Sequence, residues 1–315
     1  MRCFTAALLV ATGSIATACC ISYGEVAKTL AKETAVIFWD QDKKVEHFIR
    51  KAEFEGEAED FGFIFPSPTQ PFRIEVADER IFGMLESMKP RSSTMGCSAE
   101  EAAKSAHAGS VEVLEQKRVG DYDVTVLKAT DGAAMGEWLS KNGHKMRPAM
   151  VPWFDHYAKR DWVFTAFKYA GKGQLKTKAV AISFNAETPH YPYRMPADTF
   201  EGGHHRPLDL FVVSQTEMDG CHNDGSSWPG EKQWTADASR IRLGLEQSLN
   251  KSVKSDPITL PDRLIVTRFK NSPKATNYDM DLTFPIERNV PIWPFIAGAA
   301  VVIGFRRAKR SEFKN

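Results

Sequence analysis

Two short apolar segments, one near each end of the 315-residue chain, limit what the chain can fold into. Near the N-terminus, Arg2 precedes an apolar run from Phe4 to Ile15, and the small-x-small motif Ala16-Thr17-Ala18 follows. A basic start, a short apolar run and such a motif are typical of a secretory signal peptide. The run is also too short to span a bilayer. We therefore predict a signal peptide over residues 1–18.

Two alternatives stay open at this end. Cleavage after Ala18 leaves Cys19 first in the mature chain, so Cys19 or Cys20 is a candidate for lipidation. Against lipidation, Ala16 stands where lipoproteins usually carry a larger aliphatic residue. The second alternative is an uncleaved segment that forms a buried N-terminal helix.

The second apolar segment, Val290 to Phe305, contains no charged residue, and five Lys or Arg follow it within nine residues. Its length corresponds to roughly 24 Å of helix, somewhat less than a hydrocarbon core of roughly 30 Å. Snorkelling arginines and local thinning of the bilayer cover such a difference. Trp293 lies where an interfacial aromatic residue is expected. We predict a transmembrane segment over 290–305.

The cations at 306–315 predict a cytoplasmic tail, because basic residues mark the cytoplasmic side of a span. Residues 19–289 then form a periplasmic or cell-surface domain, held to the membrane by the C-terminal helix. Two alternatives are a buried core helix and a sorting signal that is removed by processing, which the short span and the prolines before it allow.

The charge balance argues against a nucleic-acid partner. Leaving out Arg2, the five C-terminal cations and Glu312, the chain has 35 Lys and Arg against 39 Asp and Glu. A mildly acidic domain lacks the basic surface that phosphate backbones require. A protein or glycan of the envelope is the partner class that we expect.

The pattern of apolar residues predicts an α+β fold, mostly antiparallel sheet with inserted helices. Strands are expected at 34–39, 45–54, 60–65, 111–114, 122–127, 162–168, 179–184, 209–214, 264–269 and 280–284. Helices are expected at 77–88, 131–141, 150–159 and 236–252, and a long loop at 220–232. The proline-rich stretch 189–200 is a candidate internal boundary. Asn142-Gly143 suits a left-handed helix end.

Four cysteines stay after removal of Cys3 with the signal. Cys97 and Cys221 each lie in a loop rich in glycine, serine or other small polar residues, in a compartment that favours disulfides. We predict a Cys97–Cys221 bond.

Candidate catalytic chemistry is sparse. His204 and His205 lie near each other in sequence, and His222 follows, so the three are weak candidates for a metal site. Adjacent histidines in a strand point to opposite faces, which argues against shared coordination. No nucleophile elbow or Walker-type phosphate loop is present in the sequence. We predict no catalytic residues and no cofactor.

Four short elements resemble a known family. They are Gly56-Glu57-Ala58-Glu59-Asp60-Phe61-Gly62-Phe63-Ile64-Phe65-Pro66-Ser67-Pro68, Val119-Gly120-Asp121-Tyr122-Asp123-Val124, Trp138-Leu139-Ser140-Lys141-Asn142-Gly143, and the strand that ends at Phe167-Lys168. Their order and spacing, from about Thr34 to Pro196, resemble the bacterial exported family called domain of unknown function 2330. The adjacent Cys19-Cys20 differs from the separated pair usual in that family, and Phe63 stands where Trp is common.

The resemblance implies an exported domain, often anchored at its C-terminus, and it assigns no activity or catalytic residues. The leading hypothesis is therefore a membrane-anchored extracytoplasmic module of the bacterial envelope with a binding or structural role. The alternative is an envelope hydrolase, metal-dependent through the loop histidines.

Overall fold

The computed structural model describes residues 20–22, 29–55, 61–90, 110–144, 146–170, 178–200, 208–228, 230–253, 256–271 and 278–286. The predicted signal peptide, Cys97, His204, His205, the segment 290–305 and the basic tail lie outside the described residues. No helix among the described residues has the length and apolarity needed to cross a membrane.

The chain up to Pro285 forms one compact unit built on three sheets. The strands are β1 (Cys20–Ser22), β2 (Thr29–Asp40), β3 (Val45–Glu55), β4 (Phe61–Ser67), β5 (Arg73–Val76), β6 (Val111–Val119), β7 (Tyr122–Ala129), β8 (Val163–Tyr169), β9 (Val180–Asn185), β10 (His190–Tyr191), β11 (Leu208–Ser214), β12 (Cys221–His222), β13 (Gly230–Asp237), β14 (Ile265–Asn271) and β15 (Leu282–Thr283). The helices are α1 (Arg80–Glu86), α2 (Gly132–Lys141), α3 (Met150–Ala158) and α4 (Arg242–Leu249), with 3-10 turns η1 (Ala197–Phe200) and η2 (Ser239–Ile241).

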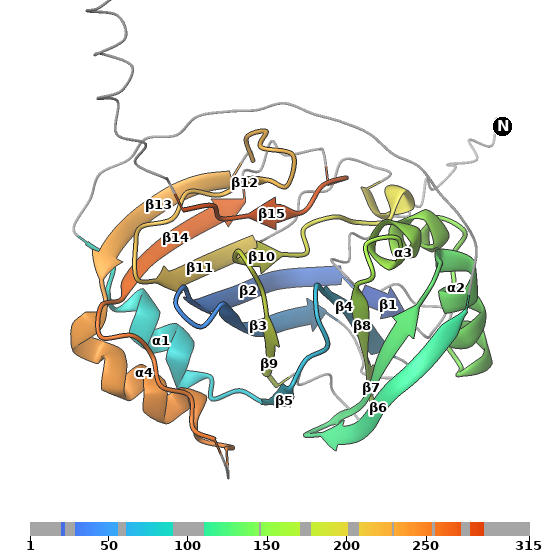
Figure 1. The fold of residues 1–315 in the computed structure, drawn as a ribbon, viewed down its shortest axis with the longest axis horizontal. Coiled ribbons are helices and arrows are strands. Elements are labelled where there is room, and N and C mark those ends of the chain that lie inside the picture. Colours follow the sequence, from blue (N-terminus) through green and yellow to red (C-terminus); the bar gives the residue numbers. More distant parts are fainter. Residues whose placement is uncertain are drawn as a thin grey trace, which may run out of the picture. The chain divides into compact units, whose positions relative to one another are not determined.

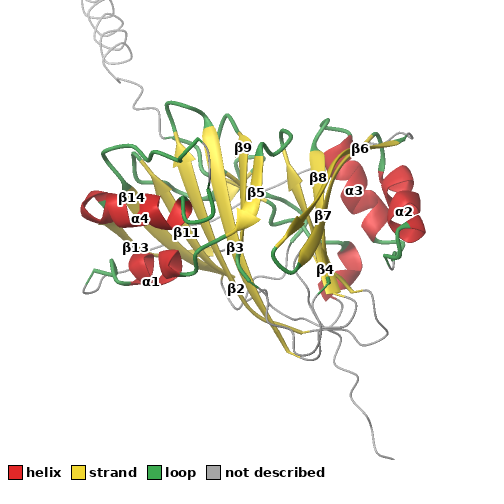
Figure 2. Cartoon of the chain, turned by 90° about the horizontal axis from the view of Figure 1, so that it is seen from below, coloured by secondary structure: helices red, strands yellow, loops and turns green. Residues whose placement is uncertain are grey.

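Two of the sheets pack face to face, with helices on both outer sides (Figures 1 and 2). The seven-stranded sheet has the order β13-β14-β11-β2-β3-β9-β5, and the five-stranded sheet has the order β1-β4-β8-β7-β6. Their facing sides meet through aromatic rings: Phe65 lies 4.5 Å from Phe48 and 5.8 Å from Phe184, measured between ring centroids. A third sheet, β10-β15-β12, is small.

Strand alternation explains the layers, because successive side chains in a strand point to opposite faces. In β3, Phe48 faces the five-stranded sheet, whereas Ile49 packs in the cluster that includes Ile81 of α1 and Leu245 of α4. On the other outer side, α2 and α3 cover the five-stranded sheet through residues such as Leu139 and Phe154. Both faces of each sheet are therefore buried over much of their area.

The α+β class with mostly antiparallel sheet is confirmed, with one qualification. Among the described strands, every pair is antiparallel except β2 and β11, which run parallel with Val36 opposite Phe211. The stretch 189–200 contains β10 and η1 within the compact unit.

Several predicted boundaries shift for physical reasons. We expected Pro66 to stop its strand, but β4 continues to Ser67. Among the described strands, β1 pairs only with residues 61–63 of β4, so Pro66 lies where β4 has a single neighbour. Proline is tolerated at such an edge. The predicted loop 220–232 contains β12 and the start of β13, and the predicted helix 236–252 begins only at Arg242.

The helix predicted at 131–141 is confirmed together with its end signals. The Asp131 side chain accepts a hydrogen bond from the Ala134 N–H at 2.7 Å, which satisfies a free donor at the first turn. At the other end Gly143 adopts φ of 79°, the left-handed conformation expected there.

Candidate functional site: a buried carboxylate among histidines

Of the predicted site residues, His222 and Cys221 lie among the described residues, whereas His204, His205 and Cys97 lie outside them. His222 lies in β12 and is buried, and its Nδ1 has no hydrogen-bond partner among the described residues. Within the described ranges, no three His, Cys, Asp or Glu side chains are arranged so that they could hold a metal ion. Cys221 is partly exposed and has no disulfide partner among the described residues, and the pKa of its thiol is raised by burial and by Asp224. Because Cys97 is outside the described residues, its pairing with Cys221 stays a prediction.

The best-defined polar cluster surrounds Asp281, which directly precedes β15 and is 1% exposed. Its Oδ1 accepts hydrogen bonds from the Tyr157 hydroxyl at 2.7 Å and from the Arg194 N–H at 3.1 Å. Its Oδ2 lies 3.5 Å from Nε2 of His156. The carboxylate is thus a junction between α3, the chain after β10, and β15.

Packing and pairing explain why these residues meet. Tyr157 is fully buried in the cluster between α3 and the five-stranded sheet. Its neighbour His156 lies on the same helix and is partly exposed. His190 of β10 pairs with Thr283 of β15, so it lies two residues along from Asp281 in the register. The edge of the His190 ring contacts Trp162 at a centroid distance of 4.5 Å.

The cluster separates charges in a definite way. Burial alone would raise the pKa of Asp281, but the hydrogen bond from His156, the proximity of His190 and the Tyr157 hydroxyl lower it to about 2. Burial lowers the pKa of His190 to about 4, and Arg160 acts in the same direction. At neutral pH the cluster therefore holds an ionised carboxylate beside a neutral imidazole.

A second acid, Glu46 of β3, lies next to His190, and its pKa is shifted in the opposite direction from that of Asp281. Its Oε2 accepts the backbone N–H of His190 at 2.8 Å, and its Oε1 has no partner among the described residues. The side chain is fully buried, and burial raises the pKa of Glu46 well above 4.5. Two carboxyl groups whose pKa values are driven apart resemble an acid–base pair.

We expect Glu46→Gln to raise the free energy of unfolding at pH 7, and to raise it less at pH 5. An acid with a raised folded-state pKa favours folding below its unfolded pKa, and this contribution is lost as the pH rises through the folded pKa. Glutamine keeps an acceptor for the His190 N–H and removes the ionisation. Denaturant unfolding at pH 5 and pH 7 measures the effect. Glu231→Gln, at an exposed position of β13, is the control. Equal stability of wild type and Glu46→Gln at both pH values would contradict the assignment.

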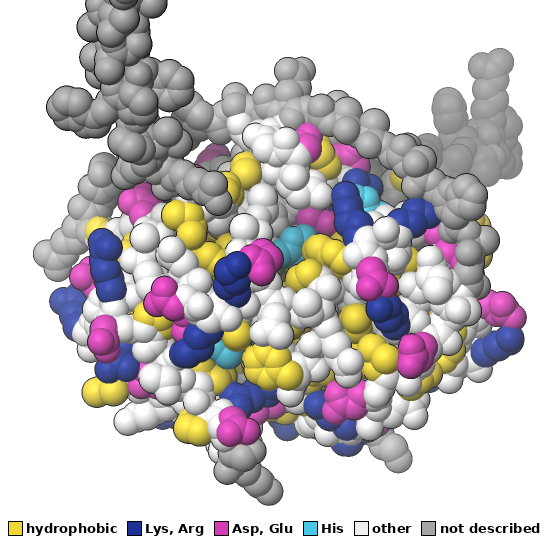
Figure 3. All heavy atoms as spheres, in the orientation of Figure 1, with side chains coloured by type: hydrophobic (Ala, Val, Ile, Leu, Met, Phe, Trp, Pro, Cys, Tyr) yellow, Lys and Arg dark blue, Asp and Glu magenta, His cyan; other side chains and the backbone are white. Residues whose placement is uncertain are grey.

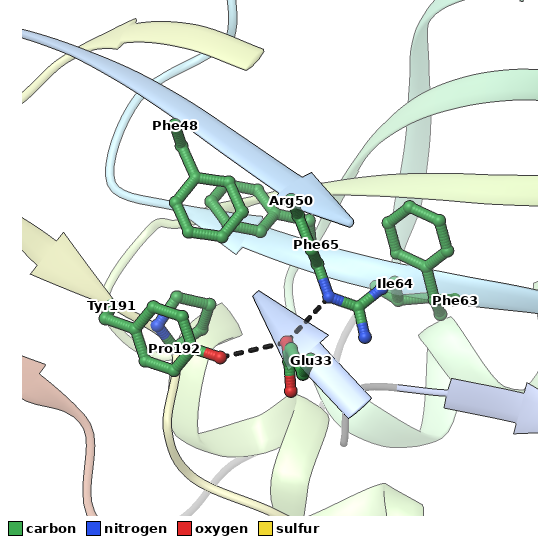
Figure 4. A pocket seen from close by; sticks show the side chains of 8 residues that line it. All are labelled: Glu33, Phe48, Arg50, Phe63, Ile64, Phe65, Tyr191 and Pro192. Atoms are coloured by element: carbon green, nitrogen blue, oxygen red, sulfur yellow. Dashed lines mark hydrogen bonds and ion pairs between the residues drawn. The ribbon is translucent and has the colours of Figure 1, made fainter. Parts of the chain in front are cut away.

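A third polar group lies between the two large sheets (Figure 4). Oε1 of Glu33 accepts hydrogen bonds from Arg50 Nε at 2.7 Å and from the Tyr191 hydroxyl at 2.9 Å. The Arg50 guanidinium also lies over the Phe63 ring, 4.7 Å from its centroid. The enclosed cavity beside these residues has a volume of about 10 Å³, which is the space of a single water molecule. A cavity of this size is too small for an organic substrate.

A serine–histidine contact on the other face of the seven-stranded sheet has a structural role. His47 Nδ1 lies 2.8 Å from Ser183 Oγ, because β3 and β9 pair these two residues directly. A nucleophilic serine must reach its substrate. Ser183 is only 1% exposed, and burial lowers the pKa of His47 to about 4. The hydrogen bond therefore satisfies two buried polar groups.

Our sequence reasoning missed Glu46, His156, His190 and Asp281 as a group. The residues come from β3, α3, β10 and the start of β15, and no short motif contains two of the four. The usable signal was weaker: Glu46 is a charged residue within a strand expected to be apolar on one face.

The three sheets, their covering helices and the buried polar groups together define a class of protein. The class is a sheet-rich α+β domain in which two helix-covered sheets enclose a polar, aromatic interior. The chain belongs to a bacterial family described as "uncharacterized protein conserved in bacteria" (DUF2330), whose sequence model matches residues 14–227. The resemblance found in the short sequence elements is thereby confirmed.

No curated protein matches the chain. A mutated baculovirus P35 after caspase cleavage has a TM-score of 0.41 at 8% identity, covering 82% of this chain and 100% of that one. Baculovirus P35 has a TM-score of 0.37 at 10% identity, covering 84% and 98%. Similarities of this size carry no inference about activity.

Proposed function

We propose that the protein is an exported module of the bacterial envelope, anchored by residues 290–305, that binds a partner or supports envelope structure without catalysis. The observation that supports a role without catalysis is the environment of Asp281. Its Oδ1 already accepts hydrogen bonds from Tyr157 and Arg194, and the carboxylate is buried. The volume of the cavity between the large sheets, about 10 Å³, leaves room for one water molecule. Binding therefore falls to the outer surface.

The surface is consistent with this role. On the face shown in Figure 3, acidic and basic side chains are interspersed with apolar ones. Such a mixed surface suits a protein or glycan partner better than a polyanion. The bacterial family and the apolar segments at the two ends of the sequence support placement in the envelope.

Topology is the first test. We expect a tag placed after Asn315 to be protected from external protease in spheroplasts while the domain before Val290 is digested. C-terminal peptide mass spectrometry on the native protein should recover the tail. A mature end before Val290 would mean that the segment is a processed signal, and digestion of the tag from outside would reverse the topology.

The alternative is a metal-dependent envelope hydrolase. It is favoured by one observation, the buried Nδ1 of His222 that lacks a partner among the described residues. Metal analysis of the purified full-length protein separates the two functions. Stoichiometric zinc that disappears in His222→Ala and His204→Ala would support the hydrolase, whereas zinc-free protein would remove this version of it.

A further inference from the structure

Two arginines beside the Asp281 cluster, Arg160 and Arg194, have no acidic partner among the residues that the structure describes. Arg160, just after α3, contacts His156 through Nη1 and contacts no carboxylate among the described residues. Arg194 donates its backbone N–H to Asp281, but its side-chain Nε is buried without a hydrogen-bond partner. Within the described ranges neither guanidinium takes part in an ion pair, in contrast to Arg50 and Arg268.

Both arginines act on the same histidine. Burial is the main cause that lowers the pKa of His156, Asp281 opposes it, and the charges of Arg194 and Arg160 lower the pKa further. His156 is 16% exposed, which places the ring at the boundary between the buried carboxylate and solvent. His190 adds a second imidazole, with Nε2 buried and without a partner.

The local charges do not balance. The cluster brings the guanidiniums of Arg160 and Arg194 close to His156, whereas its ionised carboxylate, Asp281, already accepts from Tyr157 and the Arg194 backbone and lies beside His156. An unpaired buried donor is costly, and native structures usually satisfy such a donor with a ligand or water when no protein acceptor is present. Guanidinium groups bind carboxylate and phosphoryl oxygens preferentially.

The fold holds the arginines in place. Trp153 of α3 donates its indole N–H to the Arg194 carbonyl at 2.9 Å, which fixes the chain after β10 against α3. Arg160 is fixed to the same helix end by its backbone N–H, which donates to the Tyr157 carbonyl at 2.9 Å. The two cations are therefore presented from a packed framework.

We propose that Arg160 and Arg194 form a binding site for an oxyanion, either a carboxylate or a phosphoryl group, at the outer edge of the Asp281 cluster. The proposal rests on the binding role proposed above and names the chemistry of the ligand. The bound anion approaches from the solvent side of His156, so the ring and the two guanidiniums separate it from Asp281. His156 gains a proton more readily when the anion is present.

Titration of the full-length purified protein tests the site, with inorganic phosphate and N-acetylglycine as separate probes. Calorimetry should show saturable binding of at least one probe, and the one that binds identifies a phosphoryl or a peptide-like carboxylate ligand. We expect Arg160→Gln and Arg194→Gln each to weaken binding at least tenfold. Arg240→Gln, at an exposed position of η2, should bind like wild type.

A second measurement does not depend on the variants. The imidazole signals of His156 should show a higher pKa with the saturating probe than without it, and protons should be taken up on binding. Absence of saturable binding, or binding that is unchanged in both arginine variants, would overturn the proposal. Failure of the envelope placement would be seen in the protease-protection experiment instead, which leaves this titration unaffected.

Discussion

Replacing Arg50 by methionine should lower the free energy of unfolding by about 3–5 kcal/mol, because the change leaves Glu33 buried without its cation. Arg50 is 4% exposed and Glu33 is 1% exposed, so water replaces little of the lost interaction. The stacking of the guanidinium on Phe63 is lost as well. Equilibrium denaturation by urea measures the difference.

The double variant Glu33→Gln/Arg50→Met separates the charge effect from packing. Glutamine removes the buried charge and keeps an acceptor for the Tyr191 hydroxyl, so the double variant should be more stable than Arg50→Met alone. The exposed pair of Arg118 and Asp123 provides the matched control, and Arg118→Met should change stability by less than about 1 kcal/mol. Simple additivity of Glu33→Gln and Arg50→Met would show that the ion pair is not coupled.

Acid should destabilise the protein well before its carboxylates are protonated. Burial lowers the pKa of both His47 and His190 to about 4. Below an unfolded pKa of about 6.5 the unfolded chain binds protons that the folded chain refuses, so stability is present above this pH and is lost as the pH falls toward 4. Each histidine contributes at most about 3 kcal/mol to the loss.

Two acids modify this profile in opposite directions. The pKa of Asp281 is lowered to about 2, so its contribution is present above pH 4 and is lost only below it. Glu46, with its raised pKa, favours folding at low pH and partly offsets the loss. Unfolding free energies between pH 4 and 7.5 should therefore fall with acidification, and His47→Gln should flatten the slope. A flat wild-type profile, or imidazole signals that titrate near pH 6.5, would show that these histidines are hydrated.

The sequence predicted the elements that follow local rules. Asp131 and Gly143 bound α2 because a side-chain cap and a left-handed residue act within a few positions of each other. It failed where distant neighbours decide. We expected a loop at 220–232 and a helix from residue 236, whereas β13 spans the end of the one and the start of the other. The strand forms because β14 offers it a partner at the sheet edge.

The buried polar contacts could not be predicted from short sequence patterns either, because they join residues that are far apart in the chain. The charge state of a glutamate in a strand depends on whether it lies beside a cation such as Arg50 or beside a neutral group such as the His190 N–H. The sequence does not show which neighbour each glutamate will have. Glu33 is ionically paired, whereas Glu46 is buried with a raised pKa, although both lie in one hairpin. Residues of β10 donate to both acids, Tyr191 to Glu33 and His190 to Glu46, but Glu33 also has Arg50 as its cation.

The parallel pairing of β2 with β11 has a consequence for how the chain reaches its folded state. Val36 cannot find Phe211 until most of the chain has left the ribosome or a translocon, and contacts of such separation slow folding. Until then the apolar side of the β2–β3 hairpin is open to other chains. We expect the nascent protein to depend on a holdase, and a chain truncated before Leu208 to aggregate even though its first hairpin is intact.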